Sequence, residues 1–200
     1  MNLLNKYVVV LALIAMSPAL SFGQQYTAVE TVEIGVKELL TTVQESRELF
    51  LTDRESYFGT IEEVLSSIVD FNAVAEVVMN RYAASASDVQ KDRFAEILRQ
   101  TLTRFYGASL VAYEGQELAF LPSRNADADP RADTVVGMEL RGGDSNLRLQ
   151  YQMFINENDE WKLKNISLDG INLGRQYFTQ FSALMAQNDN DIDAVLDSWK

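Results

Sequence analysis

The stretch that decides the fold is Leu147-Arg148-Leu149-Gln150-Tyr151-Gln152-Met153-Phe154-Ile155. Apolar side chains occupy every odd position of this stretch, and polar side chains occupy the first three even positions. Successive side chains of a strand point to opposite faces, so the alternation predicts a strand with one apolar face. Gly142-Gly143-Asp144-Ser145 precedes it and predicts a hairpin turn, because glycine adopts positive φ at no steric cost.

Further strands are expected on both sides of this stretch. Residues 116–122 and 134–141 alternate in the same way and are separated by a polar loop, while residues 156–160 turn the chain into a last strand at residues 161–168. The sequence therefore predicts an antiparallel meander over about residues 116–168.

Helical periodicity dominates about residues 26–112, where apolar residues recur every three or four positions. Thr52 with Glu55 and Ser87 with Gln90 have the spacing of capping boxes, and Asp70 is a plausible N-cap. The longest helix is expected after Ser87, with an apolar stripe of Phe94, Leu98, Leu102, Phe105, Tyr106 and Leu110. Helices are expected again over about residues 171–199. Helices, then a meander, then helices are typical of an α+β domain.

Composition excludes several classes of chemistry. The 200 residues include no Cys and no His, which rules out thiolate nucleophiles, imidazole ligands and Ser-His-Asp catalysis. Asp70 and Asp169 remain as conceivable buried general bases, although a helix cap and a turn explain them more simply. The acidic stretch from Asp189 lacks the Gly and Glu that an EF-hand requires, so we expect no metal site.

The first 23 residues have the organisation of a cleaved signal peptide. Lys6 is followed by an apolar run over residues 7–16 and then by small residues ending at Gly23, after which we expect cleavage. The run is shorter than the roughly 20 residues that span a bilayer. The expected division is a signal peptide at residues 1–23 and one exported domain at residues 24–200.

The chain is strongly acidic, with 29 Asp and Glu against 17 Lys and Arg and a net charge of −12. Loss of the signal peptide removes only one charged residue, Lys6, and makes the balance more negative. Such a surface is repelled by nucleic acid, so we expect no nucleic-acid partner.

A set of short motifs runs in order along the chain: Asp70-Phe71, Met79-Asn80-Arg81-Tyr82, the helical stripe from Phe94 to Tyr106, Tyr113-Glu114-Gly115, Tyr151, Trp161, Gly170-Ile171-Asn172-Leu173, Tyr177 and Gln180-Phe181. In their order and spacing these motifs resemble the MlaC family of periplasmic phospholipid-shuttle proteins. The resemblance covers roughly residues 61–196. The chain departs from the family pattern at Asn80 and Ala83 in the second motif, and at Asn165, Asn172 and Phe178.

The resemblance implies a carrier, not an enzyme, with helices packed on a curved antiparallel sheet around an apolar cavity that holds the acyl chains of a phospholipid. The implied partners are an outer-membrane lipoprotein–porin complex and an inner-membrane MCE-domain ABC transporter, with the chain as a periplasmic monomer that carries lipid as cargo and no cofactor. The expected lipid contacts are Phe71, Val74, Val78, Leu102, Tyr106, Leu110, Val136, Met138, Leu149, Tyr151, Met153, Leu173 and Tyr177. Among them, the face of Leu149, Tyr151 and Met153 is expected to form one wall, with the long helix covering the same sheet.

Two alternatives remain open on the sequence alone. One is an exported enzyme of similar α+β shape that uses Asp and Tyr in acid–base chemistry. The other is an exported adaptor or chaperone with a solid core and no ligand.

Overall fold

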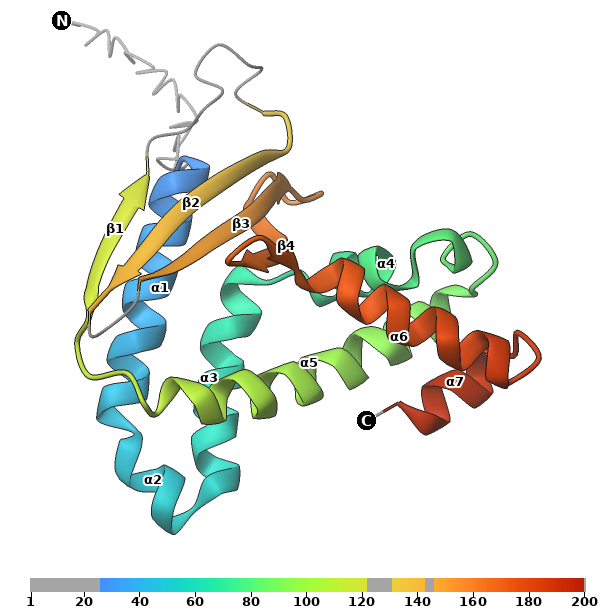
Figure 1. Ribbon diagram of the computed structural model, residues 1–200, viewed down its shortest axis with the longest axis horizontal. Coiled ribbons are helices and arrows are strands. Elements are labelled where there is room, and N and C mark those ends of the chain that lie inside the picture. The colour runs from blue at the N-terminus through green and yellow to red at the C-terminus, as the bar shows by residue number, and fades with distance from the viewer. Residues whose placement is uncertain (1–25, 122–130, 143–145, 200) are drawn as a thin grey trace, which may run out of the picture.

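A single antiparallel sheet forms one side of the molecule in a computed structural model that describes residues 26–121, 131–142 and 146–199 (Figure 1). Its strand order follows the chain, β1-β2-β3-β4-β5. The strands are β1 (Glu117–Leu121), β2 (Thr134–Arg141), β3 (Leu147–Ile155), β4 (Trp161–Leu168) and β5 (Ile171–Asn172). The predicted meander is therefore confirmed, with β5 as an addition that the sequence pattern did not predict.

The strand register explains how β4 keeps its apolar residues on one face. Gln152 pairs with Asn165 but Met153 pairs with Leu163, so Lys164 is an extra residue on β4. A bulge of this kind shifts the odd–even alternation by one position. Leu163 before the bulge and Ile166 after it consequently pack against the same apolar cluster.

The first helix, α1 (Ala28–Glu45), lies along the sheet, as Figure 1 shows. Thr27 and Glu30 form a capping box at its start. The chain then forms the short helix α2 (Arg47–Thr52) and returns in α3 (Arg54–Ile68), which packs on α1. The two helices approach closely at Gly35, where a Cβ would lie 2.3 Å from the Ile68 side chain.

The remaining helices form a second body beside the sheet. They are α4 (Phe71–Met79), the 3₁₀ turn η1 (Asn80–Tyr82), α5 (Asp88–Leu110), α6 (Leu173–Gln187) and α7 (Ile192–Ser198). The caps predicted for two of them are confirmed. Asp70 accepts a hydrogen bond from the Ala73 amide at 2.9 Å, and Ser87 with Gln90 forms a capping box.

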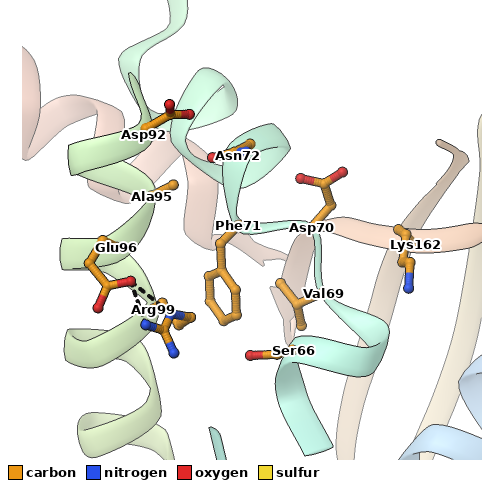
Figure 2. A pocket seen from close by; sticks show the side chains of 10 residues that line it. All are labelled: Ser66, Val69, Asp70, Phe71, Asn72, Asp92, Ala95, Glu96, Arg99 and Lys162. Atoms are coloured by element: carbon orange, nitrogen blue, oxygen red, sulfur yellow. Dashed lines mark hydrogen bonds and ion pairs between the residues drawn. The ribbon is translucent and has the colours of Figure 1, made fainter. Parts of the chain in front are cut away.

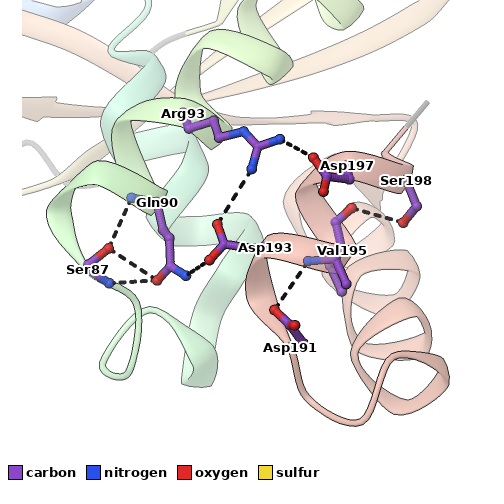
Figure 3. Close-up of polar contacts among 9 residues, drawn as sticks. Ser87, Gln90, Arg93, Asp191, Asp193, Val195, Asp197 and Ser198 are labelled. Atoms are coloured by element: carbon purple, nitrogen blue, oxygen red, sulfur yellow. Dashed lines mark hydrogen bonds and ion pairs between the residues drawn. The ribbon is translucent and has the colours of Figure 1, made fainter.

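Polar contacts hold the C-terminal helix α7 against the start of α5 (Figure 3). Gln90 donates to Asp193 at 2.9 Å, and Arg93 forms ion pairs with Asp193 and Asp197. Asp191 caps α7 through the Ala194 amide. The acidic tail therefore serves as cap and ion-pair partner, and no cluster of possible metal ligands occurs in the described part of the chain.

Some expectations about boundaries were wrong. Asp53, and not Thr52, caps α3, because Thr52 ends α2 and its hydroxyl donates to the Glu48 carbonyl. The C-terminal helices begin at Leu173 after β5, not at residue 171. The predicted signal peptide at residues 1–23 lies outside the described residues, and so do all residues of the predicted turn at 142–145 except Gly142. Within those residues, no helix combines the length and apolar character needed to cross a membrane.

Candidate functional site

The predicted lipid contacts are distributed over three apolar clusters. The sheet cluster has Val136, Met138, Tyr151 and Met153 as buried members, with Leu149 packed against them. The helical cluster of α4 to α7 includes Phe71, Val74, Val78, Leu102 and Tyr177. Leu110 belongs to a third cluster around Tyr57 and Ile61, and Leu173 is half-buried at the start of α6.

The sheet cluster is built from rows of cross-strand neighbours. Val136 pairs with Tyr151 and Met138 pairs with Leu149 in the ladder between β2 and β3. Tyr151 and Met153 are buried, whereas Leu149 is only half-buried. The structure thus confirms that Leu149, Tyr151 and Met153 share a face, and it separates them into an enclosed part and a margin.

The element that packs on this face is α1. Ala28 and Val32 of α1 are buried members of the sheet cluster, while α5 makes its main contacts with α3, α4 and α7. The expectation that the long helix covers the sheet was therefore wrong. The apolar stripe of α5 packs against α4 instead, because Phe94, Ala95 and Leu98 of α5 lie in one cluster with Val78 of α4.

Two tyrosines join α5 and α6 at the edge of the helical cluster. The hydroxyl groups of Tyr106 and Tyr177 lie 3.4 Å apart, and both residues are half-buried. Burial, aided by the Tyr177 hydroxyl, raises the pKa of Tyr106 above its ordinary value. Burial likewise raises the pKa of Tyr151, whose hydroxyl donates to the sulfur of Met138 at 3.9 Å.

The start of α6 is fixed to β4 by the two asparagines that depart from the family pattern. The Asn165 side chain donates to Asn172 Oδ1 at 3.1 Å and accepts from the Gly174 amide at 3.0 Å. Asn172 in turn caps α6 through the Arg175 amide at 2.9 Å. Gly174 is required here, because a Cβ would lie 2.6 Å from Val77. These departures therefore form a paired polar anchor.

The other departures are accommodated near η1. Asn80 has φ of 50°, a conformation that Asn tolerates better than most residues. Ala83 packs against the helical cluster, and Phe178 lies 6.4 Å from the ring of Tyr82. Phe178 thus forms an aromatic contact at one of the positions where the chain departs from the family pattern.

A surface hollow of about 450 Å³ lies among α3, α4, α5 and β4 (Figure 2). Phe71 projects into it and is the only one of the thirteen predicted lipid contacts that lines it. Both cations that line it already have partners, since Arg99 pairs with Glu62 and with Glu96 of the same lining, and Lys162 donates to the Ser67 carbonyl at 2.7 Å. This polar hollow is therefore distinct from the predicted acyl pocket.

The two aspartates considered as general bases have structural partners. Asp70 caps α4, and the Asp169 carboxylate accepts from the Arg148 amide at 2.8 Å. Asp169 also has φ of 47°, followed by Gly170 at 83°, which agrees with the predicted turn. Burial makes Tyr106 and Tyr151 hold their protons more tightly than usual, which disfavours proton transfer by these two hydroxyl groups near neutral pH.

Sequence reasoning missed several residues that contribute to the apolar face. Phe120 of β1 pairs with Met138, and Ile166 of β4 pairs with Tyr151. Both residues therefore extend the rows of cross-strand neighbours on the apolar face of the sheet. Ala28 and Val32 of α1 complete the layer. Alternation within β1 would have identified Phe120, whereas Ile166 required the bulge and Val32 required the tertiary fold.

Comparison with known proteins assigns the family. The model of the MlaC family, described as MlaC protein, matches residues 35–200. The chain belongs to the MlaC family. It is also 30% identical over 190 residues to the toluene tolerance protein ttg2D of Pseudomonas putida, covering 94% of this chain and 86% of that protein.

The fold of this MlaC-family chain matches that of a solved structure. A phospholipid-binding protein from Ralstonia solanacearum, determined in complex with a phospholipid, superposes with a TM-score of 0.77 at 22% identity. The match covers 86% of this chain and 94% of that protein. At this identity the likeness establishes the shared α+β fold.

Proposed function

We propose that this chain is a periplasmic phospholipid carrier that moves lipid between outer-membrane and inner-membrane complexes and performs no catalysis. Membership of the MlaC family carries the proposal, because the family model spans residues 35–200. The relative named for toluene tolerance and the structural neighbour that holds a phospholipid support it.

Elementary energetics explain why such a carrier is needed. Two acyl chains contain about 30 methylene groups, and exposing them to water costs roughly 25 kcal/mol at ~0.8 kcal/mol each. An unshielded lipid therefore crosses an aqueous compartment too rarely to be useful. An apolar pocket replaces the bilayer interior as the environment of the chains, so extraction is close to neutral and the partner complexes determine direction.

The exposure of the predicted contacts is consistent with this role. Leu149 and Ile166 on the sheet, and Leu102 and Tyr177 on the helices, are half-buried although each packs against an apolar cluster. Half-burial beside a closed core is the exposure expected of side chains that line a pocket for acyl chains. We assign these half-buried margins to the lipid site, whereas fully buried members of the thirteen predicted contacts, such as Val78 and Met153, form the closed core behind it.

The finer parts of the proposal concern location and partners. The signal-peptide pattern over residues 1–23 supports export to the periplasm. The partners are a lipoprotein–porin complex in the outer membrane and an MCE-domain ABC transporter in the inner membrane, and the carrier acts as a monomer. Phospholipid is the cargo, and no cofactor or metal takes part.

Extraction of the purified protein with organic solvent, followed by lipid mass spectrometry, tests the proposal. We expect about one phospholipid per chain, which a solid-cored adaptor does not carry. An unrelated exported protein of similar charge, purified in the same way, measures the background lipid. Lipid at background level in the native protein, together with failure to take up phospholipid from vesicles, would exclude the carrier.

A further inference from the structure

Acidic residues are missing from two segments that the fold brings together. Residues 77–87 and 170–188 contain no Asp or Glu, although the chain has 29 of them among its 200 residues. The first segment includes the end of α4 and η1, the second includes β5 and α6, and α4 packs against α6. The outer side of this pair is therefore electrostatically unlike the rest of an acidic molecule.

Arg81 of η1 is held in place on this surface without a carboxylate partner among the described residues. Its Nη2 donates to the Tyr82 hydroxyl at 2.9 Å and to Ser182 Oγ of α6 at 3.1 Å. Its guanidinium carbon lies 4.9 Å from the ring centroid of Tyr82 and 5.5 Å from that of Phe178. Stacking on two rings orients the group while leaving its charge exposed.

Arg175 provides a second cation on the same side of α6. Positions 175, 178 and 182 follow the i, i+3, i+7 spacing of one helix face. The exposed Arg175 side chain has no hydrogen bond or ion pair within the described residues. By contrast, Arg93, Arg104 and Arg148 are engaged in ion pairs.

We infer that Arg81, Tyr82, Arg175, Phe178 and Ser182, the Arg81–Arg175 surface, dock an acidic segment of a partner protein. A carboxylate accepts two parallel hydrogen bonds from the planar guanidinium group of an arginine. Arginine beside aromatic rings is also the composition enriched where protein interfaces gain most of their affinity. An acidic carrier needs such a local surface to bind an acidic segment against its own net repulsion.

A bilayer fits this surface less well than a protein does. Electrostatic binding to anionic lipid takes clusters of about four to eight Lys or Arg, whereas this surface has two on a chain of net charge −12. Arg175 is also two positions from Tyr177, and side chains two positions apart on a helix point to nearly opposite sides. The surface is therefore separate from the Tyr177 side of α6, and the inference does not require that the chain bind lipid.

Binding of a capped hexaglutamate peptide at low ionic strength tests the inference. The double variant Arg81→Gln/Arg175→Gln should bind the peptide about tenfold more weakly than the native chain, the sum of two exposed charge pairs. Lys37→Gln/Arg54→Gln removes the same charge from exposed positions on α1 and α3 and should change the affinity less than about twofold. Equal losses in the two variants, or no saturable binding by the native chain, would overturn the inference.

Two further measurements separate folding and membrane effects from docking. Arg175→Gln alone removes a side chain that has no hydrogen bond or ion pair among the described residues, so it should leave the melting temperature unchanged and still weaken peptide binding about threefold. Vesicles of phosphatidylethanolamine and phosphatidylglycerol should bind the native chain and the double variant equally. Vesicle binding that depends on the two arginines would assign the surface to membranes instead. Co-purified lipid, measured on the same samples, should not differ, so failure here is distinguishable from failure of the proposed carrier function.

Discussion

The helical cluster and the sheet cluster are both built from apolar side chains, but different elements close them. In the helical cluster, Phe94 lies between Phe181 and Trp199, with ring centroids 5.2 and 5.0 Å away, and α7 covers its end. In the sheet cluster, Met153 is fully buried together with Ala28 and Val32 of α1, while Leu149 stays half-buried at the margin. A closed core beside an incompletely covered apolar face is the arrangement that a carrier of apolar cargo requires.

Introducing a charged side chain should produce the largest difference between a fully buried position and a half-buried one. Met153→Asp places an uncompensated carboxylate where no side-chain surface is exposed, and we expect the cooperative melt to be lost. Leu149→Asp, four residues away on the same face, should keep a cooperative melt because water reaches the margin, but it should lose the bound lipid. Circular dichroism melts and lipid mass spectrometry measure the two effects.

Either of two outcomes would contradict the assignment of Leu149. Unfolding of Leu149→Asp would place this residue in the closed core, and full lipid occupancy in a folded Leu149→Asp would place the pocket elsewhere. Gln150→Asp, at an exposed position on the opposite face of β3, is the matched control and should change neither measurement.

The helical cluster should respond to a cavity as a close-packed core does. Phe94→Ala removes a fully buried ring and should lower the free energy of unfolding by about 3–5 kcal/mol. Phe105→Ala, on the same helix but 63% exposed, should cost less than about 1 kcal/mol. Urea denaturation measures both values. Similar costs for the two variants would mean that Phe94 does not lie in a closed core.

Local patterns predicted most of this fold because the determining interactions are local. Alternation over residues 147–155 identified β3, and the caps at Asp70 and Ser87 located the starts of two helices. The cap of α3 was displaced by one residue, since both Thr52 and Asp53 are capable of capping and only the break after α2 decides between them. Strand β5 was missed because two residues carry no periodicity.

The candidate site was predicted only in part because its closure depends on long-range packing. The shared face of Leu149, Tyr151 and Met153 follows from alternation alone. The sequence does not reveal that α1 rather than α5 packs on this face, since both helices have apolar stripes. The sequence also does not predict that Lys164 is an extra residue, because a bulge is recognised only when the two strands are aligned.

Alkaline pH distinguishes buried from exposed tyrosines. Burial raises the pKa of Tyr151, so above pH 10 the unfolded chain releases this proton while the folded chain retains it, and stability falls as pH rises. We expect Tyr151→Phe to remove about 1 kcal/mol of this loss between pH 10 and 11, because the unfolded tyrosine is only half ionised at pH 10. Tyr26→Phe, at an exposed position, is the control. Urea denaturation at each pH tests this, and identical pH profiles for native protein and Tyr151→Phe would show that the Tyr151 hydroxyl is not enclosed.

The smallest effect is expected from the lipid headgroup. No Lys or Arg occurs among the thirteen predicted contacts, and Arg175 is two positions from Tyr177 on the helix and therefore points away from it. The acyl chains therefore provide most of the recognition, at ~0.8 kcal/mol for each buried methylene group. Competition between phosphatidylethanolamine and phosphatidylglycerol of identical chains should change occupancy by less than about tenfold, or 1.4 kcal/mol. Shortening both acyl chains by four carbons should weaken binding far more, because eight methylene groups are lost. A headgroup preference beyond about a hundredfold, roughly 2.7 kcal/mol, would require a phosphate-binding group that these contacts do not include.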